Sequence, residues 1–103
     1  MKKIIFFLIG IWLSLAGICQ AKTITLTWDA SSGEVWGYNL YYGFASGSYE
    51  YVIDVGDTLE YSLEVEPNVK YYFAVTAYNG NGESGYSNEV FYEYIFNDPP
   101  IAN

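Results

Sequence analysis

From Thr23 onward, apolar and polar residues alternate with a period of two, and this alternation predicts strands rather than helices. In the segment 23–28, Ile24, Leu26 and Trp28 share one face, while three threonines share the other. Similar runs rich in Ile, Val, Thr, Tyr and Phe recur between turn residues, and no helical spacing of apolar residues interrupts them. Strands are expected over residues 23–28, 36–42, 51–55, 59–65, 69–78 and 87–94. The sequence therefore predicts an all-β fold, an antiparallel β-sandwich.

The alternation also assigns each side chain of a strand to the core or to the outer face. The residues expected at the centre of the core are Trp28, Tyr38, Leu40, Tyr71, Phe73 and Val75. In the longest strand, residues 69–78, the positions expected to face outward are Tyr72, Ala74, Thr76 and Tyr78.

The first 21 residues have the order of a secretory signal peptide. Lys2 and Lys3 precede an apolar run that ends at Ile18, shorter than the stretch of about 20 residues that spans a bilayer. Cys19 and Ala21 are small residues at the third and first positions before a cleavage site that lies between Ala21 and Lys22. We therefore expect a signal peptide at 1–21, one domain at 22–96 and a proline-containing tail at 97–103. The mature protein is expected to be secreted, or to remain at the cell surface or in the periplasm.

Cys19 offers an alternative, because bacterial lipoproteins are lipidated on a cysteine at the end of the signal. The preceding residue, Ile18, occupies the position that needs Gly, Ala or Ser, which favours plain cleavage after Ala21. The mature chain would then contain no thiol, and its stability would have to come from packing.

Charge and composition exclude several classes of function. After residue 21 the chain has two lysines against twelve acidic residues, a net charge of −10, and it has no arginine. Nucleic acid is therefore not an expected partner, and neither is membrane insertion after cleavage. The chain has no histidine, which excludes Ser-His-Asp triads and the common zinc sites, and no cofactor is expected.

Acidic residues could still serve as paired catalytic carboxylates or as calcium ligands. Asp54, Asp57 and Glu60 are close in sequence, but they lie at a turn and on an outer face, where solvated acids are ordinary. Asn79, Asn81 and Glu83 form only part of a calcium-loop pattern. A non-catalytic protein without a metal site is the expectation.

Several segments together resemble a bacterial fibronectin type III domain over about residues 23–94. They are Trp28, the run 37–42, Pro67 followed by the run 71–77, and the segment 79–87. The resemblance implies an immunoglobulin-like sandwich and a tyrosine corner at Tyr71, whose hydroxyl would bond to backbone a few residues upstream. Because Lys22 almost adjoins the first strand, the family's usual A strand is expected to be short or missing.

Aromatic residues exceed what the core of so small a domain can hold, with twelve tyrosines after residue 21. Rings on outer faces suit contact with a protein or a polysaccharide, although they also stabilise sheets without any ligand. The resemblance places contacts on loops and exposed strand faces. The candidate binding residues are Trp36, Tyr41, Tyr49, Tyr78, Asn81 and Tyr86. The expected function is a binding or adhesion module; the alternative is a passive spacer or a structural subunit of a surface assembly that self-associates.

We predict that the exported protein begins at Lys22, because the small residues before it suit signal peptidase. The intact mass of the exported material tests this. A mass that retains Cys19 with added acyl chains would establish the lipoprotein alternative.

Overall fold

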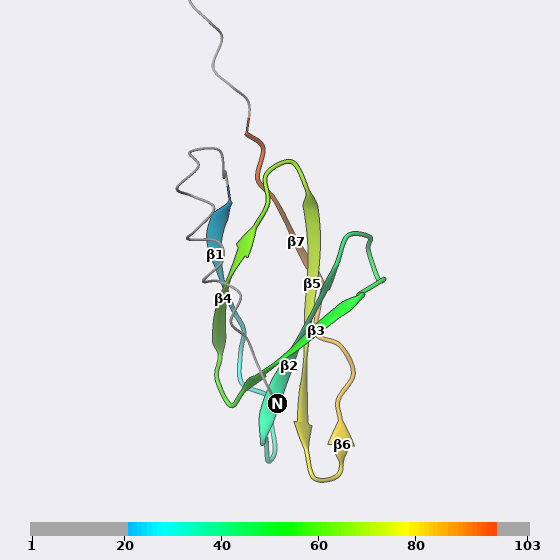
Figure 1. Ribbon diagram of the computed structural model, residues 1–103. Coiled ribbons are helices and arrows are strands. Elements are labelled where there is room, and N and C mark those ends of the chain that lie inside the picture. Colours follow the sequence, from blue (N-terminus) through cyan, green and yellow to red (C-terminus); the bar gives the residue numbers. More distant parts are fainter. Residues whose placement is uncertain (1–20, 97–103) are drawn as a thin grey trace, which may run out of the picture.

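The computed structural model describes residues 21–96, and this range contains strands but no helix (Figure 1). The strands are β1 (Lys22–Thr27), β2 (Gly37–Gly43), β3 (Tyr51–Gly56), β4 (Glu60–Val65), β5 (Lys70–Asn79), β6 (Gly82–Glu83) and β7 (Val90–Glu93). Accordingly, no helix in residues 21–96 has the length and hydropathy to cross a membrane. The predicted signal peptide up to residue 20, with Cys19, and the predicted tail lie outside the described residues.

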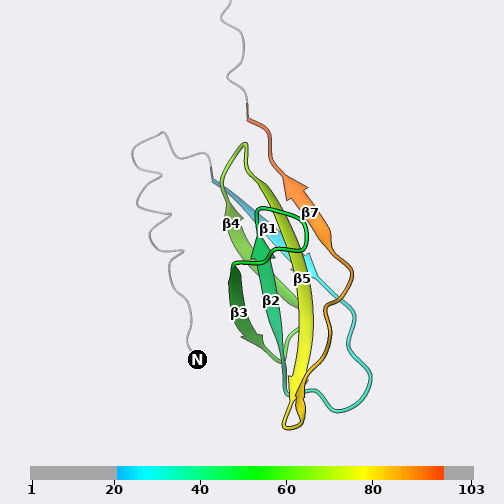
Figure 2. The same cartoon turned by 90° about the vertical axis from the view of Figure 1, so that its right-hand side faces the viewer.

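Two antiparallel sheets of unequal width face each other, which confirms the predicted all-β sandwich (Figures 1 and 2). The narrow sheet contains β1 and β4, paired from Lys22 opposite Val65 to Thr27 opposite Glu60. The wide sheet has the order β3-β2-β5, with β6 and β7 both paired along the remaining edge of β5. No described strand pairs with the other edge of β1, so the family's A strand has no counterpart in residues 21–96.

The core lies where the narrow sheet covers the wide one. Leu40, Val65, Tyr71 and Phe73 are buried together, and half-buried apolar side chains from β1, β4 and β7 pack around them. Tyr38 is also buried, and its hydroxyl accepts a hydrogen bond from the backbone N–H of Ser31 at 3.0 Å. Alternation along the strands thus places most of the expected central residues in the interior.

Trp28 and Val75 were expected at the centre of the core, but they lie at its border, where Val75 still packs against the buried cluster. Both are only partly buried, and both line an open groove beside β1. The cause is the missing neighbour of β1, since no described strand covers this side of the sandwich. The indole Nε1 of Trp28 is buried but has no hydrogen-bond partner within the described residues.

Tyr71 forms the predicted tyrosine corner. Its hydroxyl accepts a hydrogen bond from the backbone N–H of Glu66 at 2.8 Å, so the polar end of a buried ring is paired. The adjoining turn contains Asn68 in the left-handed region, with φ of 63°. The side chain of Asn68 both donates to the Phe96 carbonyl and accepts from the Phe96 N–H, which fixes the end of the described chain.

The last strand is shorter than predicted, because residues 84–89 do not pair as regular strand. Ser84 and Ser87 replace the missing ladder. The N–H of Ser84 donates to the Ala77 carbonyl while its Oγ accepts from the Ala77 N–H, and Ser87 does the same with Val75. The two serine hydroxyls thus accept the hydrogen bonds from N–H groups of β5. In a regular sheet, backbone carbonyls of the neighbouring strand would accept these bonds.

The two ends of the described domain lie at the same pole of the sandwich (Figures 1 and 2). The Lys22 ammonium lies 5.2 Å from the ring centroid of Tyr94 and 5.9 Å from that of Tyr92. These cation–π contacts join the start of β1 to the chain that leaves β7.

We predict that Phe73→Ala lowers the free energy of unfolding by about 3 to 5 kcal/mol, because it removes a fully buried ring and leaves a cavity. Denaturant unfolding measures the change. Phe91→Ala removes the same ring from an exposed position and serves as the control, so equal losses for the two variants would contradict the assigned core.

Candidate binding surface

Three of the candidate tyrosines form one cluster on the outer face of the wide sheet. Tyr41 comes from β2, Tyr49 from the loop before β3, and Tyr86 from the segment between β6 and β7. The centroid of the Tyr86 ring lies 5.0 Å from that of Tyr41 and 5.1 Å from that of Tyr49, and both contacts are edge to face. We call Tyr41, Tyr49 and Tyr86 the tyrosine cluster. Tyr86 is its most accessible member, with 57% of its surface exposed.

Glu83 anchors one end of the tyrosine cluster. Its carboxylate accepts hydrogen bonds from the Tyr41 hydroxyl, from Thr76 Oγ1 at 2.6 Å and from Asn39 Nδ2 at 3.2 Å. These donors hold the pKa of Glu83 below its ordinary value, with Thr76 contributing most. The carboxylate therefore links β2, β5 and β6 on this face.

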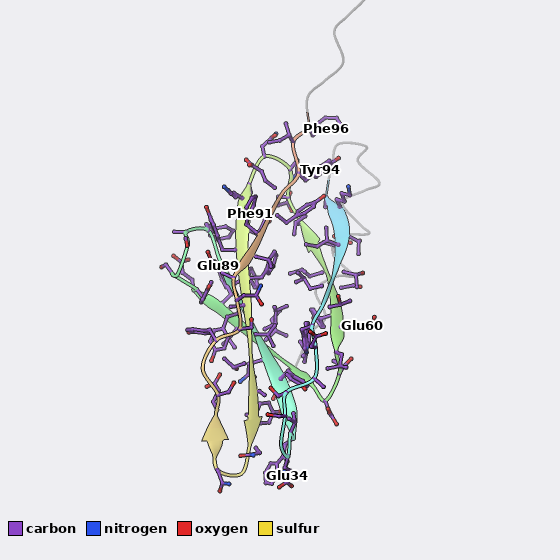
Figure 3. The ribbon with its side chains drawn as sticks, turned by 180° about the vertical axis from the view of Figure 1, so that it is seen from behind. Glu34, Glu60, Glu89, Phe91, Tyr94 and Phe96 are labelled. Carbon is purple, nitrogen blue, oxygen red and sulfur yellow. The ribbon has the colours of Figure 1, made fainter. Side chains whose placement is uncertain are left out.

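Glu89 anchors the other end, just before β7 (Figure 3). It accepts from Ser46 Oγ at 2.6 Å, from the Gly47 N–H at 2.8 Å and from the Tyr49 hydroxyl at 2.6 Å. These bonds lower the pKa of Glu89, and that from Ser46 contributes most. The turn after β2 is thus fastened to the start of β7.

Two outward-facing residues of β5 are buried beneath this arrangement. Ala74 and Thr76 lie on the outer face as expected, yet they are only 2% and 3% exposed. Tyr41 lies directly opposite Ala74 in the β2–β5 pairing, and Glu83 reaches over Thr76. The Tyr41 ring and the Glu83 carboxylate thus cover these two small residues of β5 and exclude them from solvent.

Tyr78 crosses the same face from β5 to β3. Its hydroxyl donates to both carboxylate oxygens of Asp54, at 2.9 and 3.0 Å, and this hydrogen bond is the main cause that raises the pKa of Tyr78. The ring passes over Gly37 so closely that any Cβ there would collide with it. Tyr78 is therefore part of the sheet's own bonding, not a free contact.

Trp36 and Asn81 lie at the loop end of the sandwich, apart from the tyrosine cluster. The Trp36 ring is 57% exposed and lies over Gly80, where a Cβ would come within 2.9 Å of it. Its Nε1 donates to Glu34 at 3.1 Å. Glu34 lies at the tip of this end of the sandwich (Figure 3). Asn81 is exposed in the β5–β6 turn and lines a shallow hollow of about 320 Å³.

Sequence reasoning missed the acidic residues that hold the aromatic ones. Glu83 was considered only as a loop ligand, and Glu89 not at all; in the fold both point at tyrosine hydroxyls. It also missed Phe91, 61% exposed on β7 beside Tyr72, with the Lys70 ammonium 4.2 Å from its ring centroid. Across residues 21–96, no group of three or more Asp or Glu side chains is placed to hold a metal ion.

Comparison with known proteins identifies the fold. The fibronectin type III domain model matches residues 14–93. A fibronectin type III domain from the human KIAA0970 protein is similar over 84% of this chain and 73% of its own, with 23% identity and a TM-score of 0.59. The third such domain of the human KIAA0343 protein covers 84% and 86%, with 19% identity and a TM-score of 0.59. The chicken CNTN1 FN1-FN3 domains match over 77% of this chain and 30% of theirs, with 21% identity and a TM-score of 0.60. No protein with a curated description matches by sequence.

We predict that two members of the tyrosine cluster ionise well above the ordinary tyrosine value. The hydrogen bond to Glu83 raises the pKa of Tyr41 to about 12, and partial burial with the bond to Glu89 raises that of Tyr49 to about 12, from 10.0. The protonated hydroxyls therefore stabilise the fold fully below pH 10, and this contribution is lost as the pH rises towards about 12.

The ultraviolet absorbance of tyrosinate, followed against pH, measures both transitions. Glu83→Gln should return the Tyr41 transition towards its ordinary value and leave that of Tyr49 in place. A single transition for all tyrosines near pH 10 would contradict the cluster.

Proposed function

Because this chain belongs to the fibronectin type III family, whose members typically serve as binding or spacer modules, we propose that it is a non-catalytic binding or adhesion module. No catalytic domain is detected beside the fibronectin type III match. We further propose that it acts outside the cytoplasm after cleavage of its signal peptide, either secreted or at the cell surface.

The observation that supports this proposal is the preorganised outer face. The rings of the tyrosine cluster pack on one another, and carboxylates hold two of the three hydroxyls. Binding to rigid aromatic side chains loses little conformational entropy, which is why tyrosine and tryptophan dominate contact surfaces. Tyr86 is exposed and contacts both other rings of the cluster, and Trp36 offers a second exposed ring, at the loop end.

The geometry favours a protein over a polysaccharide as the partner. Sugar rings stack on flat, open aromatic faces, whereas the rings here meet edge to face, at interplanar angles of 86° and 71°. A surface of tilted rings beside bonded carboxylates suits the uneven relief of another protein. Contacts with proteins are also common for fibronectin type III modules.

The second candidate function is a structural subunit or spacer in a surface assembly. One observation favours it, the unpaired edge of β1, because a free edge is a site at which another chain can add a strand.

We predict that Trp36→Ala combined with Tyr86→Ala abolishes binding to a cell surface or to an arrayed set of surface proteins and glycans. Truncating exposed anchor rings costs at least about 2 kcal/mol of binding when they are central to an interface. Phe44→Ala is the matched control, since Phe44 is exposed but packs against Tyr51 and Tyr71, away from the tyrosine cluster.

Equal binding by the double variant and the parent would show that the exposed aromatic residues do not contribute to binding. Binding to glycans alone would replace the protein partner by a polysaccharide. The absence of any binding, together with association that depends on concentration, would favour the structural subunit.

A further inference from the structure

We propose that the free edge of β1, with the groove beside it, binds an extended basic segment of another polypeptide, which adds a strand to the narrow sheet. This surface is separate from the tyrosine cluster, and the inference does not depend on the function proposed for that cluster. Strand addition of this kind obtains affinity from backbone hydrogen bonds and specificity from alternate side chains.

The pairing of β1 with β4 shows which backbone groups are free. The register continues past Thr27 to a hydrogen bond from the Trp28 N–H to the Leu59 carbonyl, at 3.1 Å. Hydrogen-bonded pairs alternate along an antiparallel ladder, so the even-numbered residues of β1 bond to β4. The N–H and carbonyl groups of Thr23, Thr25 and Thr27 therefore point to the other edge, where no described strand pairs.

β1 lacks the features that normally protect an edge strand. Between Thr23 and Thr27 it has no proline and no charged side chain, and its ladder with β4 contains no bulge. The register irregularity of the sandwich lies instead between β2 and β3. The edge is thus a regular template for pairing.

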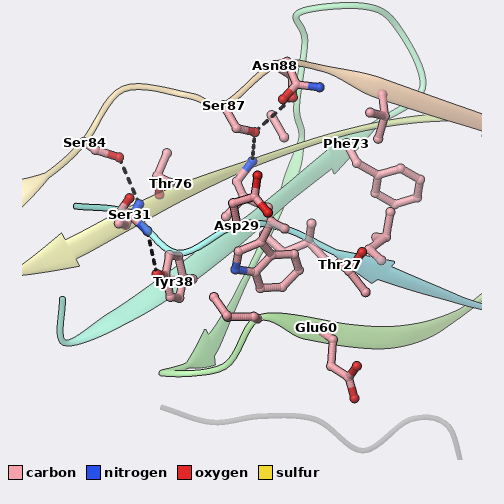
Figure 4. A pocket seen from close by; sticks show the side chains of 18 of the residues that line it. Thr27, Asp29, Ser31, Tyr38, Glu60, Phe73, Thr76, Ser84, Ser87 and Asn88 are labelled. Atoms are coloured by element: carbon pink, nitrogen blue, oxygen red, sulfur yellow. Dashed lines mark hydrogen bonds between the residues drawn. The ribbon is translucent and has the colours of Figure 1, made fainter.

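A groove of about 700 Å³ adjoins this edge (Figure 4). Its apolar lining includes Leu26 of β1 with Trp28 just after it, Phe73 and Val75 of β5, and Val90 of β7. Strands of one sheet lie about 4.8 Å apart, so a strand added to β1 would direct alternate side chains into the groove. An apolar wall beside a row of free backbone groups matches a strand whose side chains alternate between apolar and polar.

The charges define the kind of strand that fits. Asp29 and Glu60 line the groove, and no basic residue does. The two lysines of the described residues lie against aromatic rings, Lys22 over Tyr94 and Lys70 over Phe91. With a net charge of −10 after residue 21, the domain attracts cationic segments and repels acidic ones.

A second copy of this chain fits the edge poorly. It carries the same net charge of −10 after residue 21, so two copies repel each other, whereas a basic segment is attracted.

The test uses the full chain, expressed so that the cell processes its N-terminus, and two synthetic peptides of the same length as β1. One has the sequence Lys-Val-Thr-Val-Thr-Lys, and the other has glutamate in place of both lysines. Amide hydrogen exchange should show Thr23, Thr25 and Thr27 unprotected in the free protein and protected by the lysine peptide. The binding should weaken with salt.

Two variants isolate the backbone contribution. Thr25→Pro removes an N–H from the free edge, and Thr25→Val keeps it, while both lose the hydrogen bond between Thr25 Oγ1 and Ser62 Oγ at 2.7 Å. Affinity for the lysine peptide should fall about tenfold in Thr25→Pro and stay close to the parent's in Thr25→Val. If Thr25→Pro does not fold, Thr23→Pro provides the same comparison.

Equal affinity of the two variants, equal binding of the two peptides or no binding at all would overturn the proposal. Protection of the three amides in the free protein would show that its own chain covers the edge. Self-association abolished by Thr25→Pro would assign the edge to a second copy; either result also overturns the proposal.

Discussion

A narrow sheet of two strands has to cover the inner face of a wider one, and this difference in width shapes the rest of the molecule. Where the cover is complete, Leu40, Val65 and Phe73 are fully buried, and Tyr71 is paired through its corner hydrogen bond. Beyond β1 there is no cover, so apolar side chains of β1, β5 and β7 border an open groove.

The outer face of the wide sheet shows how an acidic domain keeps many aromatic rings in order. Small residues of β5 leave room for Tyr41 above them. Glu83 in β6 and Glu89 just before β7 accept hydrogen bonds from the hydroxyls of Tyr41 and Tyr49. Each carboxylate gains three donors and each ring gains a fixed orientation. Acidic side chains thus also organise the tyrosine cluster.

Alternation in the sequence was enough to predict the sandwich and the first five strands to within about one residue at each end. It could not predict the broken last strand, because period-two alternation does not show that the Ser84 and Ser87 hydroxyls replace backbone carbonyls beside β5. It also overestimated the burial of Trp28, since period-two patterns assign a face but not the cover above it. The tyrosines of the candidate surface were identifiable as surplus rings, whereas their glutamate partners were not, because an exposed acid has no pattern of its own.

The common pole of Lys22 and Tyr94 decides how the domain responds to mechanical force. A module strung between two anchors transmits tension along its long axis only if its ends emerge at opposite poles. Here a pull on both ends would peel β1 from β4 and β7 from β5, one hydrogen bond at a time, instead of shearing a whole ladder at once. Tension between Lys22 and Tyr94 would therefore unzip the described strands at a lower force than tension applied across opposite poles.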